Sequence, residues 1–224
     1  DNNTPDFFGS LNPILQTGLS PTNHTMFTNI KKVEPGEIIE FDFHSLKFSN
    51  YKYLDLKNWV NKEEYERIDK LSEKNLINEF SEKIETSVKK HAISDAKIGT
   101  SLSLGLDSSL IYSMLNKNTD NKDLFSITYI PENDEKFLLK KNIKKFINSN
   151  HKVYTEKNYN FIENIADVSY FSETVGREDT MILMEISKIC RENGIKVLMT
   201  GDGADEISGA VDYQLKHYFN SLGY

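Results

Sequence analysis

Apolar and polar positions follow one pattern before residue 60 of the chain and another pattern after it. In the first part, short apolar runs follow turn signals: the run Glu37–Phe43 comes directly after Pro35-Gly36, and four of the five prolines fall here. A second short strand is predicted over residues 47–53. Residues 1–60 are therefore predicted to form the last part of a β-rich domain.

After residue 60 the apolar positions take helical spacing and then alternate between helices and strands. Leu76, Ile77, Phe80, Ile84 and Val88 fall on one face of a predicted helix. Strands are then predicted over residues 97–102, 124–129, 151–154 and 195–200, and helices over residues 108–115, 134–147, 160–170 and 180–192. Since parallel strands need long crossover connections, this alternation predicts an open, mostly parallel, doubly wound α/β sheet over residues 61–224.

Composition narrows the class of protein. With 224 residues the chain has room for one large domain or two small ones, and 38% hydrophobic with 27% charged residues is ordinary for a globular protein. The net charge of −7 argues against a general nucleic-acid or acidic-membrane binder, which usually has a basic surface. The sequence has no apolar run long enough to span a membrane and no signal-peptide pattern, so a cytoplasmic protein is expected.

Cysteine and histidine chemistry is not indicated. The one cysteine, Cys190, excludes an internal disulfide framework and a zinc–thiolate cluster, and its place in an apolar helical stripe predicts a core position. The five histidines are scattered, without a metal-binding pair at helical spacing, and are interpreted as surface or structural residues.

The segment Ser103–Ser109 follows a predicted strand and opens a predicted helix. Its hydroxyl groups, together with the free N–H groups at a helix start, can bind an anion such as phosphate. Gly105 permits close approach of the backbone, and Asp107 offers the oxygen ligand that magnesium needs beside a phosphate chain. The segment is not a Walker P-loop, because it lacks Gly-Lys-Ser/Thr. Taken alone, it is explained equally well as a helix N-cap cluster.

The segment Thr200–Glu206 also follows a predicted strand and holds two glycines and three carboxylates. Asp202 and Asp205 are placed to help hold a cation. Taken alone, a polar turn before a helix is the better interpretation. Ligands of open α/β sheets lie beyond the carboxyl ends of the strands, near a switch in strand order, so the two loops together favour a nucleotide between them.

A family resemblance runs through five ordered segments of the chain, from about residue 11 to about residue 209. Ser103–Ser109 resembles the Ser-Gly-Gly-Leu-Asp-Ser-Ser pyrophosphatase loop of the glutamine-dependent asparagine synthetases, whose relatives include β-lactam synthetases and lasso-peptide cyclases. Thr200–Glu206 resembles their Ser-Gly-(Asp/Glu)-Gly-Ala-Asp-Glu segment, and Phe125–Ile127 resembles the start of Phe-Ser-Ile-Gly-Phe. Thr25–Ile30 and Pro35-Gly36 resemble the end of their N-terminal glutaminase domain.

The resemblance implies an ATP-pyrophosphatase type of fold and an amide-forming ligase. Such enzymes bind ATP with magnesium, activate a carboxylate as an acyl-adenylate, release pyrophosphate, and let a nitrogen nucleophile form the amide. A metal and oriented N–H groups must stabilise the charge that develops on the leaving pyrophosphate. The implied partners are a small-molecule or peptide carboxylate and ammonia or another amine donor.

Site residues follow from the resemblance position by position. Asp107 and Asp205 would hold magnesium. Asp202 matches an acidic position near the substrate or nucleophile. Asp202 and Glu206 are the candidate catalytic residues. Pyrophosphate would be cradled by Ser103, Gly105, Ser108 and Ser109, and adenosine would lie near Leu102, Ile127, Thr200 and Gly201. The family's catalytic lysine lies well downstream of the second loop and its nucleophilic cysteine at the start of the glutaminase domain. Complete catalysis is therefore expected to need further segments or a partner chain, and a homo-oligomer is a further option.

Leu104 departs from the family pattern, because it stands where the loop has its first glycine. In left-handed backbone a leucine costs about 1–2 kcal/mol, and its side chain would obstruct a phosphate that comes close; in extended backbone it is harmless. If Leu104 impairs the loop, Leu104→Gly should strengthen Mg-ATP binding. A second departure, Ile207-Ser208-Gly209-Ala210 in place of Phe-Gly-Gly-Tyr, concerns local packing.

Two hypotheses therefore stand. The first is an ATP-dependent amide-forming ligase, which the retained polar residues of both loops favour. The second is a degenerate, inactive member that binds a nucleotide or acts as a scaffold, which Leu104 and the absent lysine favour. Sulfur transfer to a nucleobase by related ATP pyrophosphatases is weaker, because those enzymes often use catalytic cysteines.

Overall fold

The computed structural model describes residues 4–17, 23–59, 61–118, 124–130, 147–155, 161–172 and 178–208. The chain divides into two compact units, residues 1–78 with 160–181 and residues 79–159 with 182–224. The predicted helix over residues 134–147 lies outside the described residues except for Ile147. The domain boundary at residue 60 stays a prediction.

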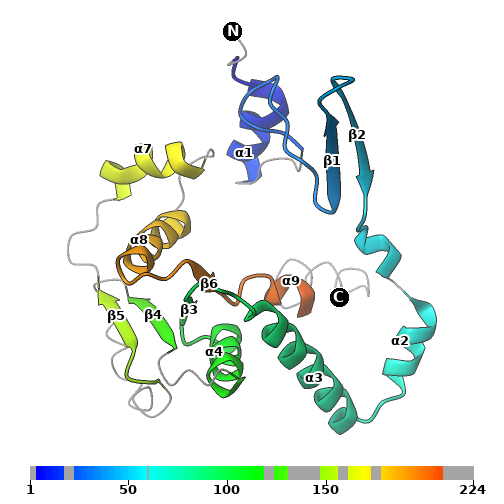
Figure 1. Cartoon of the computed structure of the whole chain (residues 1–224), viewed down its shortest axis with the longest axis vertical. Helices are drawn as coiled ribbons and strands as arrows, with labels where there is room; N and C mark the ends of the chain where they lie inside the picture. Colours follow the sequence, from blue (N-terminus) through cyan, green and yellow to red (C-terminus); the bar gives the residue numbers. More distant parts are fainter. Residues whose placement is uncertain are drawn as a thin grey trace, which may run out of the picture. The chain divides into compact units, whose positions relative to one another are not determined.

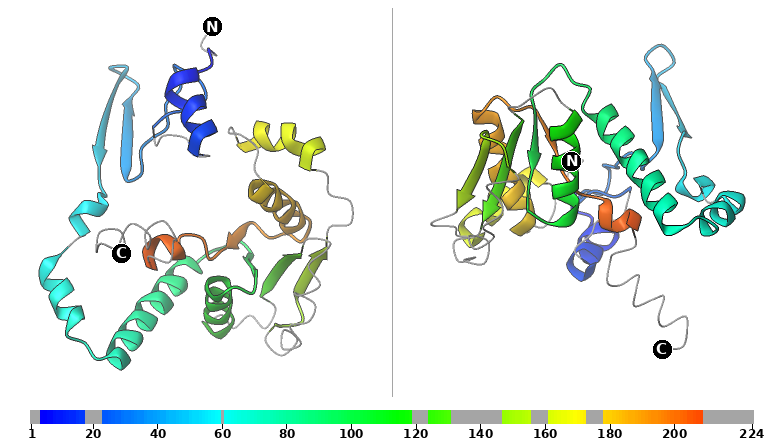
Figure 2. Two further views of the ribbon diagram at one scale, coloured as in Figure 1. Left: turned by 180° about the vertical axis from the view of Figure 1, so that it is seen from behind. Right: turned by 90° about the horizontal axis from the view of Figure 1, so that it is seen from below.

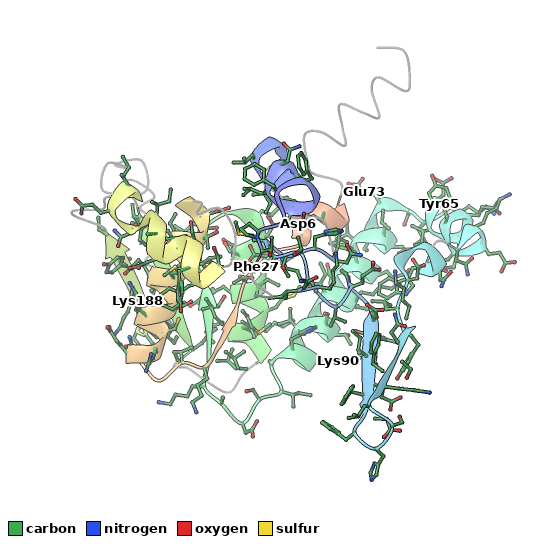
Figure 3. All side chains as sticks on the ribbon, turned by 90° about the horizontal axis from the view of Figure 1, so that it is seen from above. Asp6, Phe27, Tyr65, Glu73, Lys90 and Lys188 are labelled. Atoms are coloured by element: carbon green, nitrogen blue, oxygen red, sulfur yellow. The ribbon has the colours of Figure 1, made fainter. Side chains whose placement is uncertain are left out.

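The first unit contains a β-hairpin and several short helices. Its backbone also joins distant positions near the start of the chain, where the Asp6 N–H donates to the Met26 carbonyl at 2.8 Å and Phe27 lies beside the same segment (Figure 3). The elements are η1 (Phe7–Leu11), α1 (Asn12–Thr17), β1 (Glu37–Asp42), β2 (Lys47–Lys52), η2 (Leu56–Trp59), α2 (Lys62–Asp69) and α7 (Phe161–Ser172).

The hairpin confirms the two strands that the sequence predicts before residue 60. β1 and β2 pair antiparallel, with Glu37 opposite Lys52 and Asp42 opposite Lys47. The turn between them is closed by the Asp42 carboxylate, which accepts hydrogen bonds from the His44 N–H at 2.8 Å and the Ser45 hydroxyl at 2.7 Å. Side chains project from both faces of this two-stranded ribbon (Figure 3).

The second unit is built on a four-stranded sheet whose strands are all parallel. Its strands are β3 (Ile98–Ser101), β4 (Phe125–Ile130), β5 (His151–Thr155) and β6 (Val197–Met199), in the spatial order β5-β4-β3-β6 (Figure 1). β4 is buried along nearly its whole length, as a central parallel strand covered on both faces should be. The prediction of an open, parallel, doubly wound sheet is confirmed.

Helices cover both faces of the sheet and form two apolar clusters. On one face, α3 (Glu73–His91) and α4 (Leu106–Asn118) pack in a cluster of Val88, Leu102, Tyr112, Leu115 and Leu124. On the other face, α8 (Glu178–Glu192) contributes Ile186 and Cys190 to a cluster with Phe125, Ile127 and Ile195. Figures 1 and 2 show α4 and α8 on opposite sides of the sheet.

Cys190 lies in the core, as the sequence predicts. Its side chain is 5% exposed, and burial raises the pKa of its thiol, which makes a reactive thiolate less accessible. The helix that carries it ends at Glu192, and Gly194 just beyond it, with φ 71°, lets the Ile195 N–H donate back to the Cys190 carbonyl at 2.8 Å. On the exposed face of the same helix, Lys188 donates to Glu185 at 2.5 Å (Figure 3).

The order of strands places a topological switch between β3 and β6. From β3 the chain moves through β4 to β5, and it then returns to the opposite side of β3 to form β6. Because crossovers between parallel strands are right-handed, reversing the direction of travel moves the connecting helix to the other face. The helix after β3, α4, and the helix before β6, α8, accordingly lie on opposite faces, and the carboxyl ends of β3 and β6 are where open α/β sheets bind ligands.

At the amino end of the sheet, His151 on β5 lies half-buried beside Ser126 on β4. Its Nδ1 is 2.8 Å from the Ser126 hydroxyl, and among the described residues its buried Nε2 has no hydrogen-bond partner. Burial lowers the pKa of the imidazole below its ordinary value of 6.5, so the neutral ring is favoured. This end is opposite to the two loops.

Within the described ranges, no helix has both the length and the apolar character needed to cross a membrane.

Candidate active site

The first loop begins at the carboxyl end of β3 and is closed by its own hydroxyl groups. The Gly105 N–H donates to the Ser103 hydroxyl at 3.4 Å, and the Ser103 and Ser108 hydroxyls are 2.9 Å apart. The Ser108 hydroxyl donates to the Gly105 carbonyl at 3.4 Å, and the Ser109 N–H donates to the same carbonyl at 3.1 Å, which starts α4. These bonds fix the loop at the helix start, where the first-turn N–H groups have no intrahelical partner.

The predicted pyrophosphate residues are not equally exposed. Ser103 and Gly105 are exposed, Ser109 is half-buried, and Ser108 is 7% exposed. Because the Ser108 hydroxyl is bonded within the loop, it serves loop closure in this structure. Ser103 and the N–H groups of the first helical turn are the groups best placed to meet an anion from outside.

Leu104 adopts the left-handed backbone that the family's glycine would adopt easily. Its φ is 61°, so the interpretation that extended backbone makes this leucine harmless is excluded. Left-handed geometry costs a leucine about 1–2 kcal/mol. Its side chain is half-buried and packs against the cluster of α3 and α4. The structure therefore shows the backbone strain, and it shows the Leu104 side chain in contact with the core.

Leu102 and Ile127, both predicted near adenosine, are fully buried in the structure at 0% exposure. Their side chains are parts of the two core clusters, so any contact with a nucleotide would have to come from their main chains. The Leu102 N–H donates to the Ile127 carbonyl at 2.8 Å, which ties the start of the loop to β4.

Thr128 supports the first candidate loop, and the sequence reasoning did not single it out. Its side chain is 1% exposed, and its hydroxyl donates to the Leu102 carbonyl at 2.5 Å, at the root of the first loop. The signal in the sequence is a threonine in a buried strand, at the position where the family motif has glycine. A buried hydroxyl on such a strand must have a partner, and here the partner is the loop.

The second loop contacts the first through Gly201, which lies directly after β6 and Thr200. A methyl group added at Gly201 would lie 2.9 Å from the Ser108 nitrogen and 3.0 Å from the Asp107 Cβ. Only glycine permits this approach of backbone to helix start. The loop then turns at Gly203, with φ 89°, and the Ala204 N–H donates to the Gly201 carbonyl at 3.3 Å as α9 (Ala204–Ser208) begins.

The four candidate carboxylates lie in these two loops and the helical turns that follow them. Asp107 is half-buried in the first turn of α4, next to Gly201, whereas Asp202, Asp205 and Glu206 are exposed. Among the described residues, no group of three or more His, Cys, Asp or Glu side chains is arranged to hold a metal ion.

The structure thus brings together the two loops that the sequence singled out. Direct proximity is established for Gly201 with Asp107 and Ser108. Asp202, Asp205 and Glu206 follow within the same loop and its short helix, on exposed backbone beyond the end of β6 (Figure 1). The arrangement offers oriented N–H groups, hydroxyls and carboxylates on both sides of the strand-order switch.

The chain matches a known protein-family model over most of its length. Residues 79–223 match the model of the family described as asparagine synthase. The matched range contains both loops, all strands of the parallel sheet, and every candidate site residue.

Three curated proteins are similar to the chain, at low identity. It is 28% identical over 204 residues to a putative asparagine synthetase (glutamine-hydrolyzing) 2 of Methanocaldococcus jannaschii, which covers 90% of the chain and 38% of that protein. It is 26% identical over 211 residues to a probable asparagine synthetase (glutamine-hydrolyzing) of Acanthamoeba polyphaga mimivirus, a match that covers 85% of the chain and 37% of that protein. A probable asparagine synthetase (glutamine-hydrolyzing) of Schizosaccharomyces pombe is 27% identical over 153 residues, a match that covers 59% of the chain and 27% of that protein. The chain therefore spans well under half the length of these relatives.

Proposed function

The chain belongs to the asparagine synthase family, and from that premise we propose that it forms the nucleotide site of an ATP-dependent, amide-forming ligase. The reaction has two steps. A carboxylate oxygen attacks the α-phosphorus of ATP, the bond to the β-phosphate oxygen breaks, and pyrophosphate leaves. A nitrogen nucleophile then attacks the acyl carbon, loses a proton, and displaces AMP to leave the amide.

The observation that carries this proposal is the packing of Gly201 on the first turn of α4. It joins the two loops at the switch between β3 and β6, although they are nearly a hundred residues apart in the chain. A triphosphate placed there would meet the N–H groups at the start of α4 on one side and the carboxylate-rich second loop on the other. Open α/β sheets bind nucleotides at this location.

The first loop would stabilise the leaving pyrophosphate. The negative charge on the pyrophosphate rises as its bond to the α-phosphate breaks. Fixed hydrogen-bond donors are most effective when they face the position where that charge develops. Ser103 and the first-turn N–H groups of α4 provide the donors, and Asp107 and Asp205 would hold magnesium. When bound, the magnesium would neutralise phosphate charge and orient the phosphate chain.

The second loop would act on the substrate side of the reaction. Asp202 and Glu206 are exposed carboxylates that can accept hydrogen bonds from an attacking amine and take up the proton it loses. The main chains of Leu102, Ile127, Thr200 and Gly201 would contact adenosine. The substrates are proposed as a small-molecule or peptide carboxylate and ammonia or another amine.

The test is the release of both AMP and pyrophosphate from Mg-ATP by the full-length protein, supplied with candidate carboxylates and ammonia. A ligase of this type gives the two products in equal amounts, and only with a suitable carboxylate. ADP and inorganic phosphate as products would contradict the proposal, because that pair requires cleavage at the γ-phosphate.

The competing function is a nucleotide-binding or scaffold protein without turnover. The left-handed Leu104 favours it, because the family pattern has a glycine at this strained position of the loop. Under this alternative, Mg-ATP binds to the same two loops, but no carboxylate yields AMP and pyrophosphate. Binding and product release measured on one preparation separate the two functions.

A further inference from the structure

We propose that Leu104 is a positioning residue, whose side chain anchors the first loop in its anion-binding conformation before any ligand arrives. The inference rests on the proposed nucleotide site and assigns the anchor to the pyrophosphate portion of a nucleoside triphosphate. It replaces the expectation that this leucine impairs the loop.

The first observation is that the strained residue is tied to the core. Leu104 is one of two non-glycine residues with positive φ among the described residues, and the other is Leu46. Leu46 lies in the hairpin turn and is 73% exposed, whereas Leu104 packs against a cluster of fully buried side chains that includes Leu115. Packing on one side of the loop thus holds a backbone conformation that leucine otherwise rarely adopts.

The second observation is the direction of the residues on either side. Ser103 and Gly105 are exposed, and the Gly105 N–H already points at the Ser103 hydroxyl, 3.4 Å away. With the Leu104 side chain turned into the core, the polar groups of its two neighbours are left on the outer side of the loop. Within Ser103–Gly105, the Leu104 side chain therefore lies on the core side of the loop, and the proposed anion-binding groups lie on the outer side.

The root of the loop is fixed in the same way. The Thr128 hydroxyl holds the Leu102 carbonyl, and the Leu102 side chain is in the cluster that Leu104 joins. Positions 102 and 104 are therefore both held from within the core, and the free segment of the loop is short. At positions 104 and 128 the family motifs have glycine, so in this chain two side chains take part in fixing the loop.

An anchored loop changes the cost of binding. A glycine at position 104 reaches left-handed backbone freely but also reaches many other conformations, so a ligand must select the competent one. The apparent affinity then falls in proportion to the fraction of molecules whose loop is already competent. Loss of the anchor should weaken ligands that contact the loop and leave other ligands unchanged.

The experiment compares Mg-ATP with AMP, which lacks the pyrophosphate portion, as ligands of the full-length protein and its Leu104 variants. Leu104→Ala keeps the strained Cβ but loses the anchor, Leu104→Gly loses both, and Leu104→Met keeps an apolar side chain of similar volume. If the competent fraction falls to about a tenth, Leu104→Ala and Leu104→Gly bind Mg-ATP about tenfold more weakly with AMP affinity unchanged, and Leu104→Met stays near wild type.

A matched control separates positioning from a general loss of stability. Ile186→Val removes one methyl group from the cluster on the opposite face of the sheet. It should lower the melting temperature without changing the ratio of ATP to AMP affinity. Equal loss of ATP and AMP affinity in Leu104→Ala, or tighter ATP binding by Leu104→Gly, would overturn the inference. Failure of the wild-type protein to bind either nucleotide would instead overturn the proposed nucleotide site on which the inference rests.

Discussion

Asp107→Asn should slow pyrophosphate release from Mg-ATP by about 10²–10³-fold, because the magnesium that Asp107 would hold stabilises the charge on the leaving pyrophosphate by several kcal/mol. Asparagine keeps the size of the side chain and one oxygen ligand but loses the negative charge that would hold magnesium. Asp107 lies half-buried in the first turn of α4, at the contact between the two loops. The measurement is the rate of pyrophosphate release at saturating ATP and carboxylate.

The fold itself should survive this substitution. Removing an acidic residue from the first turn of a helix costs about 0.3–1 kcal/mol of stability, which a melting curve would register as a small shift. Asp95→Asn is the matched control, because Asp95 is exposed and precedes β3, at the opposite end of the strand from the site. A wild-type rate in Asp107→Asn, or an equal loss in Asp95→Asn, would remove Asp107 from the site.

Gly201→Ala should have the second-largest effect, because its methyl group has no room. It would lie 2.9 Å from the Ser108 nitrogen, 3.0 Å from the Asp107 Cβ and 3.1 Å from the Asp107 carbonyl carbon. These are atoms of a helix start, so the second loop must move away from α4. Overpacking of this kind costs about 1–3 kcal/mol of stability, and the displaced loop should weaken Mg-ATP binding by more than about tenfold.

The control for Gly201→Ala is a substitution at a glycine where left-handed backbone would be strained but the added methyl group would meet no other atom. Gly194 has φ 71°, and an added methyl group there would meet nothing within 4 Å. Gly194→Ala should therefore cost about 1–2 kcal/mol of stability through left-handed strain alone. Its nucleotide affinity should be that of wild type. If the two variants lose affinity equally, close contact between the loops is not what the site requires.

The sheet could be predicted from the sequence because each strand carries its own local signal. The strand predicted over residues 124–129 is rich in aromatic and β-branched residues, and in the structure it is the buried central strand Phe125–Ile130. The sequence predicts helical texture from about residue 61 but gives no bounds for α2, because Lys62–Asp69 is mostly charged. Asn61 caps this helix by accepting a hydrogen bond from the Glu64 N–H at 3.1 Å. The charged residues of this segment give no helical apolar pattern, so the helix depends on its cap instead.

The site could be predicted only in part, for a different reason. The types of residue in the two loops indicated phosphate and magnesium chemistry, but contact between them depends on strand order, which no local pattern contains. The proximity of Gly201 to Ser108 is therefore information that the fold adds. Leu104 illustrates the limit: its identity left two backbone conformations open, and the core under the loop decides between them.

The central claim is that a magnesium–nucleotide complex binds between the loops after β3 and β6. Calorimetric titration of the full-length protein with Mg-ATP tests it most directly, beside Asp107→Asn, Asp205→Asn and the control Asp95→Asn. The account predicts magnesium-dependent binding that each site substitution weakens by about tenfold or more and the control leaves unchanged. Binding that is indifferent to both substitutions, or no binding by the folded protein, would contradict it.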